Sequence, residues 1–199
     1  MREFILKASK AFTKMFRLND LPGAGRMDLV CRCVTNALWL SHALRRDIIF
    51  HAALEGPDRP PKILSFDGEK LVGVSLDERN IASNICIALE KGYNLRSNEE
   101  IELPSGIKIA KKSFEQLVKE KSKTTQLFYL HPKGKDIRKV EFTQNVCFIL
   151  GDHLGLPSAT EKLLKRFNAQ KISLGKIEYL ASNCVAICNY ELDRILELS

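Results

Sequence analysis

Two glycine-bearing stretches in the C-terminal quarter of the chain have residues suited to small-molecule binding. They read FILGDHLGLP at 148–157 and ISLGKIEYLASNC at 172–184. A third candidate, YLH at 129–131, is followed by Pro132. Glycine in such loops lets the backbone approach a ligand closely, because it has no Cβ atom and adopts unusual dihedral angles. Any one of the three is typical of an ordinary turn, but two glycine loops in succession favour a ligand site.

Several other kinds of site lack their sequence signals. The chain has no G-x-x-x-x-G-K-[ST] motif, which argues against a P-loop nucleotide site. GAGR at 23–26 looks like the start of a dinucleotide fingerprint, but Asp28 stands where the third glycine belongs. His42 and His51 accompany no G-x-S-x-G motif, so a hydrolase triad is not indicated.

The cysteines do not form the pattern of a metal site. Cys31 and Cys33 are two residues apart on a predicted helix, where they point to different faces. Cys184 and Cys188 share a face, but no second pair of ligands completes a tetrahedron. The six cysteines lie mostly in apolar segments, unlike those of a disulfide scaffold. We therefore expect reduced thiols, a cytoplasmic protein and no bound metal.

The candidate loops belong to a chain in which strands and helices alternate. Short β-rich runs predict strands at 3–9, 47–54, 62–66, 125–131, 146–151 and 171–175, with a hairpin at 101–110. Periodic segments predict helices at 27–46, 77–92, 112–121, 158–167 and 180–195. Ser158 and Glu161 have the spacing of a capping box. The continuously apolar strands indicate an α/β fold around a mostly parallel sheet, with ligands at the carboxyl ends of its strands.

Composition and charge limit the classes of protein that are possible. The 199 residues suffice for one domain, and no run of about 18 apolar residues is present to span a membrane. The N-terminus lacks the long apolar region of a secretory signal. Lysine and arginine exceed aspartate and glutamate by 31 to 24, and the resulting charge of +7 suits a polyanionic partner.

The chain resembles a known superfamily in several of these motifs. FILGDHLGLP, ISLGKIEYLASNC and the closing NYELDR are similar to the cofactor loops and terminal helix of the SPOUT methyltransferases. Within that superfamily, LPGAGRMDLVCRCVTNALWLSHALRRD at 21–47 resembles the N-terminal block of the archaeal tRNA pseudouridine N1-methyltransferases, the TrmY family. The resemblance covers nearly the whole chain. Relatives that modify ribosomal RNA share the fold and the chemistry.

The resemblance implies a single SPOUT domain over residues 1–199, with helices on both faces of the sheet and a deep trefoil knot formed by residues 125–199. S-adenosylmethionine is then expected to lie between the three C-terminal loops, in an apolar slot with backbone hydrogen bonds. By position, the resemblance assigns the following residues to the cofactor: Leu130, Gly151, Leu174, Gly175, Lys176, Ile177, Glu178, Tyr179 and Cys184.

The implied reaction is methylation of N1 of pseudouridine at position 54, in the T-loop of tRNA. Because this nitrogen must lose a proton, a nearby carboxylate is expected to act as general base or to orient a water molecule. Asp67 has the family position for this role, although Asp-Gly is also the usual pair in a turn. Cys184 either contributes to catalysis and the cofactor pocket or belongs to the apolar stripe of the last helix.

Arginines are expected to bind the phosphates of the RNA without reading its sequence. The candidates cluster around the first helix and the GPDRPP loop, and they are Arg26, Arg32, Arg45, Arg46 and Arg59. A merely solvated helix face is the alternative. The run HPKGKDIRK at 131–139 predicts a basic hairpin beside the first cofactor loop.

The oligomeric state and the class of RNA stay open at this level. The superfamily resemblance implies a homodimer, in which the apolar stripe of the terminal helix packs against a second copy. The same helix is equally suited to pack on its own sheet. The alternatives to a tRNA methyltransferase are a ribosomal RNA pseudouridine N1-methyltransferase and a non-catalytic protein of the same fold that binds RNA or assists ribosome assembly.

Overall fold

The computed structural model describes residues 1–196, and within them eight strands form one sheet in the order β4-β5-β3-β2-β1-β7-β6-β8. The strands are β1 (Arg2–Ala8), β2 (Ile48–Leu54), β3 (Lys62–Asp67), β4 (Glu100–Glu102), β5 (Ile107–Ala110), β6 (Gln126–Asp136), β7 (Val146–Gly151) and β8 (Gln170–Ser173). Strands β2, β1, β7, β6 and β8 are parallel to one another, whereas β3, β5 and β4 extend the sheet in antiparallel fashion. The predicted α/β fold with a mostly parallel sheet is confirmed.

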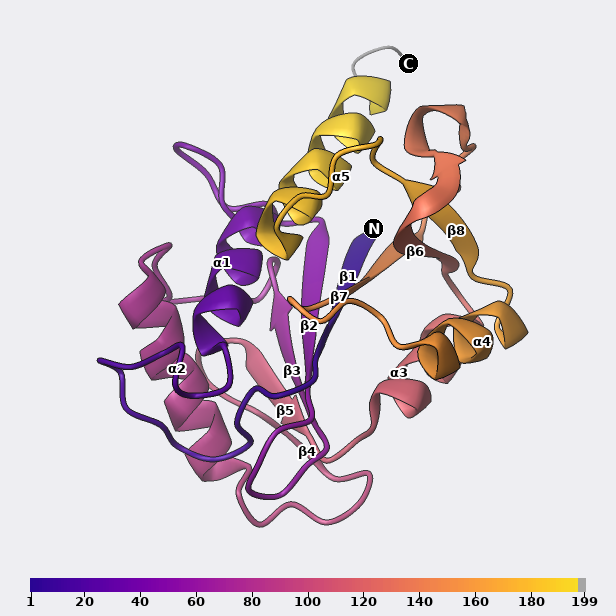
Figure 1. Ribbon diagram of the computed structural model, residues 1–199. Helices are drawn as coiled ribbons and strands as arrows, with labels where there is room; N and C mark the ends of the chain where they lie inside the picture. The colour runs from indigo at the N-terminus through magenta and orange to yellow at the C-terminus, as the bar shows by residue number, and fades with distance from the viewer. Residues whose placement is uncertain (197–199) are drawn as a thin grey trace.

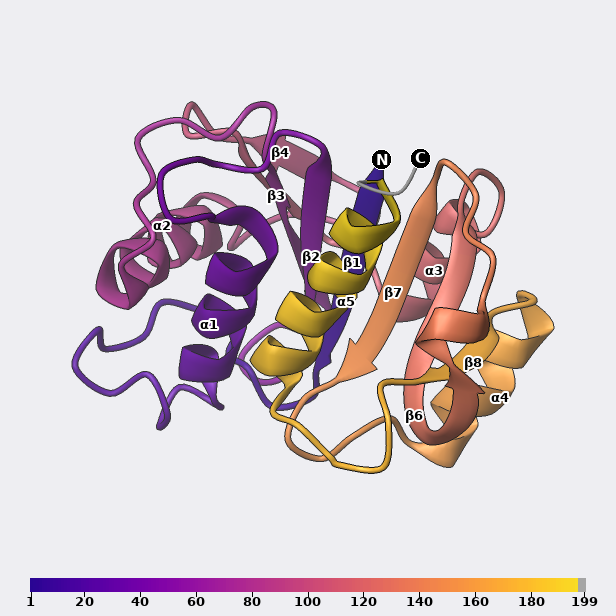
Figure 2. The same ribbon diagram turned by 90° about the horizontal axis from the view of Figure 1, so that it is seen from above.

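Helices cover both faces of this sheet, as Figures 1 and 2 show. One face carries α1 (Met27–Leu38), α2 (Glu78–Lys91) and α5 (Ala181–Leu196), and the other carries α3 (Phe114–Lys121) and α4 (Ser158–Arg166). A short 3₁₀ helix, η1 (Ile137–Lys139), follows β6. Each face has its own hydrophobic core.

Strand β1 shows why the central strands are mostly apolar. Successive side chains of a strand point to opposite faces, so Phe4 and Ile5 enter different cores. Phe4 stacks on Phe148, which in turn stacks on Phe128, and this aromatic row joins three neighbouring parallel strands. Burial on both faces favours apolar side chains, which is the pattern that predicted parallel strands. The charged side chains of β1, Arg2, Glu3 and Lys7, are buried in ion pairs.

Helix α5 is fixed to elements from the first quarter of the chain. It packs along α1, where the Asn189 side-chain amide donates to the carbonyl of Asn36 at 3.1 Å. In return, the Asn36 side-chain amide donates to the carbonyl of Ser182 at 2.8 Å. Further along α5, the Asp193 carboxylate accepts hydrogen bonds from Arg2 of β1 and from Arg45. These contacts fix α5 to α1 and to the start of β1.

Three local predictions are wrong. The helix predicted over 27–46 ends at Leu38, because Trp39 turns extended and pairs with Leu44, so that Leu40 is exposed. The predicted capping box is absent: Pro157 occupies the N-cap of α4, and Glu161 forms an ion pair with Lys171.

The third wrong prediction is the basic hairpin at 131–139. The chain continues as β6 to Asp136 because both Leu130 and Lys135 pair with Ile172 of β8, and the residues between them bulge outward. Gly134 makes this possible, since a Cβ there would lie 2.2 Å from the carbonyl carbon of Ile172. Residues 197–199, which the predicted domain and knot include, lie outside the described residues.

The contacts of Asp193 predict an acid-sensitive contribution to stability. Burial alone would raise the pKa of its carboxyl, but hydrogen bonds and charge from Arg45 and Arg2 outweigh burial and hold the pKa below its ordinary value of 3.8. A lowered pKa gives stability that is present above the unfolded-state pKa and lost as the pH falls through the folded-state pKa. Asp193→Asn should therefore reduce the free energy of unfolding by about 1–3 kcal/mol at pH 7, and by less at pH 3, which lies below the ordinary pKa of 3.8.

Urea unfolding at the two pH values measures this difference, with Asp47→Asn as the matched control. Asp47 pairs with the same Arg2 at 3.5 Å but is largely exposed, so its removal should cost less than about 1 kcal/mol. Equal effects of the two substitutions, or an Asp193→Asn effect that persists unchanged at pH 3, would contradict the assignment.

Candidate active site

A cavity of about 650 Å³ opens at the carboxyl ends of β7 and β8 and beside the bulge of β6, which begins after Leu130. Because these strands are parallel, the segments that follow them meet at one edge of the sheet. The walls come from residues 130–132, 150–156 and 173–184, and the start of α1 adds Arg26 and Arg32. The three strand ends that the sequence singled out thus line one cavity.

Glycines shape the second and third loops. A Cβ on Gly151 would lie 2.3 Å from the carbonyl carbon of Gly155, so the turn between them folds directly back on the end of β7. Gly155 and Gly175 have φ angles of 72° and 122°, a region that other residues adopt only with strain. The backbone of both loops therefore forms part of the cavity wall.

Asp152 fixes the second loop to the end of β1. Its carboxylate accepts hydrogen bonds from the backbone N–H of Ser9 at 2.7 Å and from that of Leu154 at 2.9 Å. Only 4% of its side chain is exposed. Both carboxylate oxygens are occupied, so Asp152 holds the loop in place.

The lining of the cavity fits the cofactor that the resemblance implies. Leucines and Ile177 provide an apolar slot for a purine, and the glycine loops offer open backbone beside it. Carboxylates for the hydroxyls of a ribose are present in Glu161 and Glu178. The residues therefore fit S-adenosylmethionine, whose adenosine part needs an apolar slot with a few polar groups.

Eight of the nine residues that were predicted to bind the cofactor line this cavity. They are Leu130, Gly151, Leu174, Gly175, Ile177, Glu178, Tyr179 and Cys184. Lys176 is the exception, because its side chain is exposed and does not line the cavity. His131, Leu156 and Ser182 also line the cavity, and they lie within the three stretches that the sequence singled out without being named as site residues. Sequence reasoning missed Leu29 and Glu161, which lie outside these stretches on predicted helices.

An ion-pair cluster at the start of α1 closes one side of the cavity. Asp28, which is buried, accepts two hydrogen bonds from the Arg26 guanidinium at 3.0 and 3.1 Å and one from Arg32 at 2.6 Å. Burial acts to raise the pKa of Asp28, but the two arginines outweigh it and lower the pKa. Arg26 has a left-handed backbone, with φ of 68°, which is uncommon outside glycine. Asp28 therefore orients two guanidinium groups toward the cavity.

Cys184 lies in the cavity wall as a half-buried thiol. Its Sγ is 3.7 Å from the carbonyl oxygen of Tyr179. Burial raises the pKa of this thiol, which keeps it protonated at neutral pH. The geometry thus suits Cys184 to lining the cavity. The remaining five cysteines are buried and free of disulfides.

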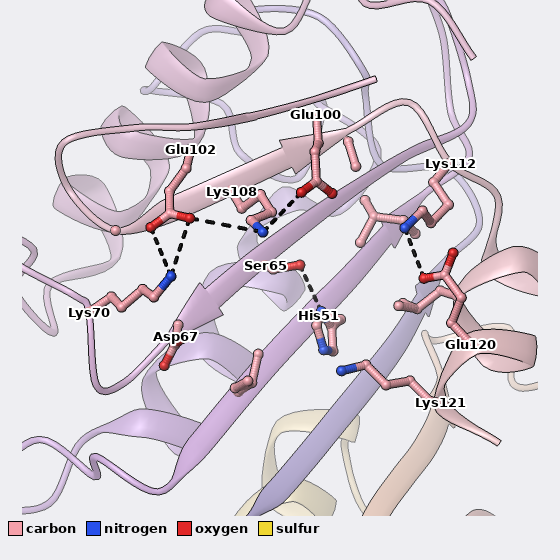
Figure 3. A pocket seen from close by; sticks show the side chains of 15 residues that line it. His51, Ser65, Asp67, Lys70, Glu100, Glu102, Lys108, Lys112, Glu120 and Lys121 are labelled. Carbon is pink, nitrogen blue, oxygen red and sulfur yellow. Dashed lines mark hydrogen bonds and ion pairs between the residues drawn. The ribbon is translucent and has the colours of Figure 1, made fainter. Parts of the chain in front are cut away.

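Asp67 lies elsewhere, in a separate hollow at the opposite edge of the sheet, which Figure 3 shows. Strand β3 is antiparallel to β2, so Asp67 pairs with Ile49 near the start of β2 instead of reaching its carboxyl end. The carboxylate of Asp67 accepts a hydrogen bond from the N–H of Glu69 at 3.0 Å, as in an Asp-Gly turn. Its partner Ile49 lies five residues before Leu54, the last residue of β2. At the rise of a strand, Asp67 is therefore about 17 Å from the carboxyl end of β2.

The predicted RNA-binding arginines divide between the two edges of the sheet. Arg26 and Arg32 line the cavity, whereas Arg45 is paired with Asp193 and Arg46 donates to the carbonyl of Gly68 at the opposite edge. The last of the set, Arg59, follows the carboxyl end of β2 and stacks over the ring of Tyr93. The structure therefore does not bring all five arginines together in one chain.

Within residues 1–196, no group of three or more histidine, cysteine, aspartate or glutamate side chains is arranged to hold a metal ion. Among the helices of this described part, none is both long and apolar enough to cross a membrane.

Comparisons with known proteins agree with this geometry. A family model described as "Putative SAM-dependent RNA methyltransferase" matches residues 1–196. The chain is 44% identical over 200 residues to a tRNA (pseudouridine(54)-N(1))-methyltransferase of Thermococcus onnurineus, covering 98% of both chains. It is equally similar, at 44%, to the Methanococcus maripaludis protein of the same name, covering 98% of this chain and 100% of the other.

The fold is also that of a solved structure. Archaeoglobus fulgidus Nep1 bound to S-adenosylhomocysteine superposes with a TM-score of 0.68, covering 98% of each chain at 14% identity. The full-length family match and the relatives at 44% identity show that the chain belongs to the family of S-adenosylmethionine-dependent RNA methyltransferases.

Proposed function

We propose that this protein transfers the methyl group of S-adenosylmethionine to N1 of pseudouridine at position 54 of tRNA. The observation that carries the proposal is the single cavity formed by the three strand-end loops, in a chain 44% identical over nearly its full length to methyltransferases named for that reaction. The predicted ribosomal RNA enzyme has weaker support, because the relatives at 44% identity are named for the tRNA reaction.

Different residues of the cavity have different roles in such a reaction. When bound, S-adenosylmethionine supplies an electrophilic methyl group on its sulfonium. The apolar wall and the glycine loops hold the adenosine part and exclude water. Arg26 and Arg32, oriented by Asp28, present positive charge at the side of the cavity where RNA phosphates would approach. Arg59 extends the positive charge of this edge.

The role of Asp67 as the group that removes the proton of the acceptor nitrogen, or orients a water molecule to do so, stays a prediction. Within one chain Asp67 is too far from the cavity, so such a role requires that a second copy place its Asp67 there. Homodimerisation is part of the proposal. Cys188 and Leu192, of the apolar stripe that was predicted to meet a second copy, pack on this chain's own sheet. The face of α5 left for a second copy is the outer one, where Asn183, Ala186 and Tyr190 are exposed. We also propose the trefoil knot that the resemblance predicts for residues 125–199, and a cytoplasmic location.

Methyl transfer to two matched transcripts tests the proposed function. One tRNA transcript carries pseudouridine at position 54 and the other carries uridine, and incorporation of labelled methyl is measured for each. We expect transfer to the pseudouridine transcript only, preceded by S-adenosylmethionine binding in calorimetry. Binding without transfer to either transcript would favour the non-catalytic alternative. Transfer to a ribosomal RNA fragment, but not to tRNA, would overturn the choice of substrate.

Asp28→Asn tests whether orientation of the two arginines matters. Loss of a negative charge alone would strengthen RNA binding, whereas loss of the shared acceptor of Arg26 and Arg32 should weaken productive binding. We expect the KM for tRNA to rise about tenfold, the equivalent of one charge-assisted hydrogen bond, with the melting temperature measured in parallel.

Glu115→Gln is the matched control, since Glu115 is an exposed carboxylate on α3, on the other face of the sheet. Its kinetics should stay close to those of the wild type. A lower KM for tRNA in Asp28→Asn, or equal kinetics for the two variants, would show that orientation by Asp28 is not used.

A further inference from the structure

A second hollow adjoins the cofactor cavity and shares Arg26 with it. Its volume is about 480 Å³, within the range of about 300–1,000 Å³ that is usual for ligand pockets. We call it the acceptor groove, and it is lined by Ser9, Lys10, Phe12, Pro22, Gly23, Gly25, Arg26, Glu55, Gly56 and Pro57. These residues come from three loops, which follow β1, precede α1 and follow β2.

The backbones of the three loops are in close contact, which gives the groove a fixed shape. A Cβ on Gly25 would lie 1.8 Å from the carbonyl oxygen of Lys10, and one on Gly56 would lie 2.1 Å from the same oxygen. The N–H of Phe12 donates to the carbonyl of Ala24 at 3.2 Å, which ties the first loop to the second. Glycine is therefore required at two positions for the walls of the groove to meet.

The groove adjoins the cofactor cavity through two wall contacts. Arg26 lines both, and the N–H of Ser9 in the groove donates to Asp152 in the wall of the cavity. The charged hollow of Figure 3 has no lining residue in common with the cofactor cavity. A molecule in the acceptor groove thus lies next to the wall of the cofactor cavity at Arg26, as a methyl acceptor requires.

The chemistry of the walls fits a planar base with a phosphate. Phe12, Pro22 and Pro57 provide apolar and aromatic surface, on which extruded bases commonly stack. Lys10 is exposed at the groove and offers a positive charge to a phosphate. Glu55 is a carboxylate held by an ion pair with Lys7, and it can accept a hydrogen bond from an imide N–H.

Positive charge surrounds the entrance. Lys14, Arg17 and Arg59 are exposed in the loops that form the groove or adjoin it. The backbone N–H of Arg59 donates to the Thr13 hydroxyl at 2.9 Å, which fixes this arginine beside the first loop. An RNA strand whose base enters the groove would therefore meet cations along its backbone.

We propose that the acceptor groove receives the extruded base that accepts the methyl group, with Glu55 accepting a hydrogen bond from an N–H of that base and Lys10 pairing with its phosphate. This inference rests on the proposed function and names the place of its substrate. The groove positions the base and provides a hydrogen-bond acceptor for it.

A matched pair of charge reversals tests the position of the RNA. Lys10 and Lys14 are exposed lysines of one loop, but only Lys10 lines the groove. A general electrostatic contribution would affect Lys10→Glu and Lys14→Glu alike. We expect kcat/KM for the pseudouridine transcript to fall at least about tenfold more in Lys10→Glu than in Lys14→Glu, with unchanged S-adenosylmethionine affinity in both.

Glu55→Gln tests the hydrogen bond, because glutamine keeps an oxygen for Lys7 while removing the negative charge. We expect kcat/KM to fall about tenfold while the affinity for S-adenosylmethionine stays that of the wild type. The melting temperature, measured in parallel, reports the weakened ion pair with the buried Lys7. Photocrosslinking gives a readout independent of folding effects: a tRNA with 4-thiouridine at position 54 should attach to peptides containing residues 9–12, 22–26 or 55–57.

The possible outcomes separate this inference from the proposed function. A wild-type chain that transfers no methyl group would overturn both. An active wild type that gives no crosslink to the acceptor groove, or whose Lys10→Glu and Lys14→Glu variants behave alike, would overturn the acceptor groove alone.

Discussion

The parallel pairing of β7 with β6, and of β6 with β8, is the constraint on which the site depends. Each strand contributes only a short loop, and none of these loops could surround a ligand by itself. Because the three strands share one direction, their loops are brought to one edge and form a single cavity. The apolar composition of the strands fixes this arrangement, since it requires burial of both faces of the sheet.

The first and last helices complete the site from opposite ends of the sequence. Helix α5 begins in the cavity wall, and α1 begins with the Asp28 cluster that faces it. The mutual hydrogen bonds of Asn36 with Ser182 and Asn189 keep the two helices in register. A ligand in the cavity thus contacts both the N-terminal and the C-terminal part of the chain. Binding therefore depends on the packing of α5 against α1.

The succession of strands and helices along the chain and most of the cavity wall could be predicted from the sequence, because both depend on local patterns. Apolar runs identify the buried strands, and glycines such as Gly151 and Gly175 mark the loops. The position of Asp67 was not predictable in this way, since it depends on the antiparallel pairing of β3 with β2. The hairpin at 131–139 failed for a related reason: its conformation is set by pairing with β8, which is distant in sequence.

A crystal structure of the protein with S-adenosylhomocysteine tests the central claim most directly. The account predicts the adenosine part between the loops that contain Leu130, Gly151 and Leu174, with Arg26 and Arg32 at the side of the cavity. It also predicts that the carboxyl ends of β6, β7 and β8 stay together as they are in the free chain. A ligand bound outside these loops, or a cavity filled by its own side chains, would contradict it.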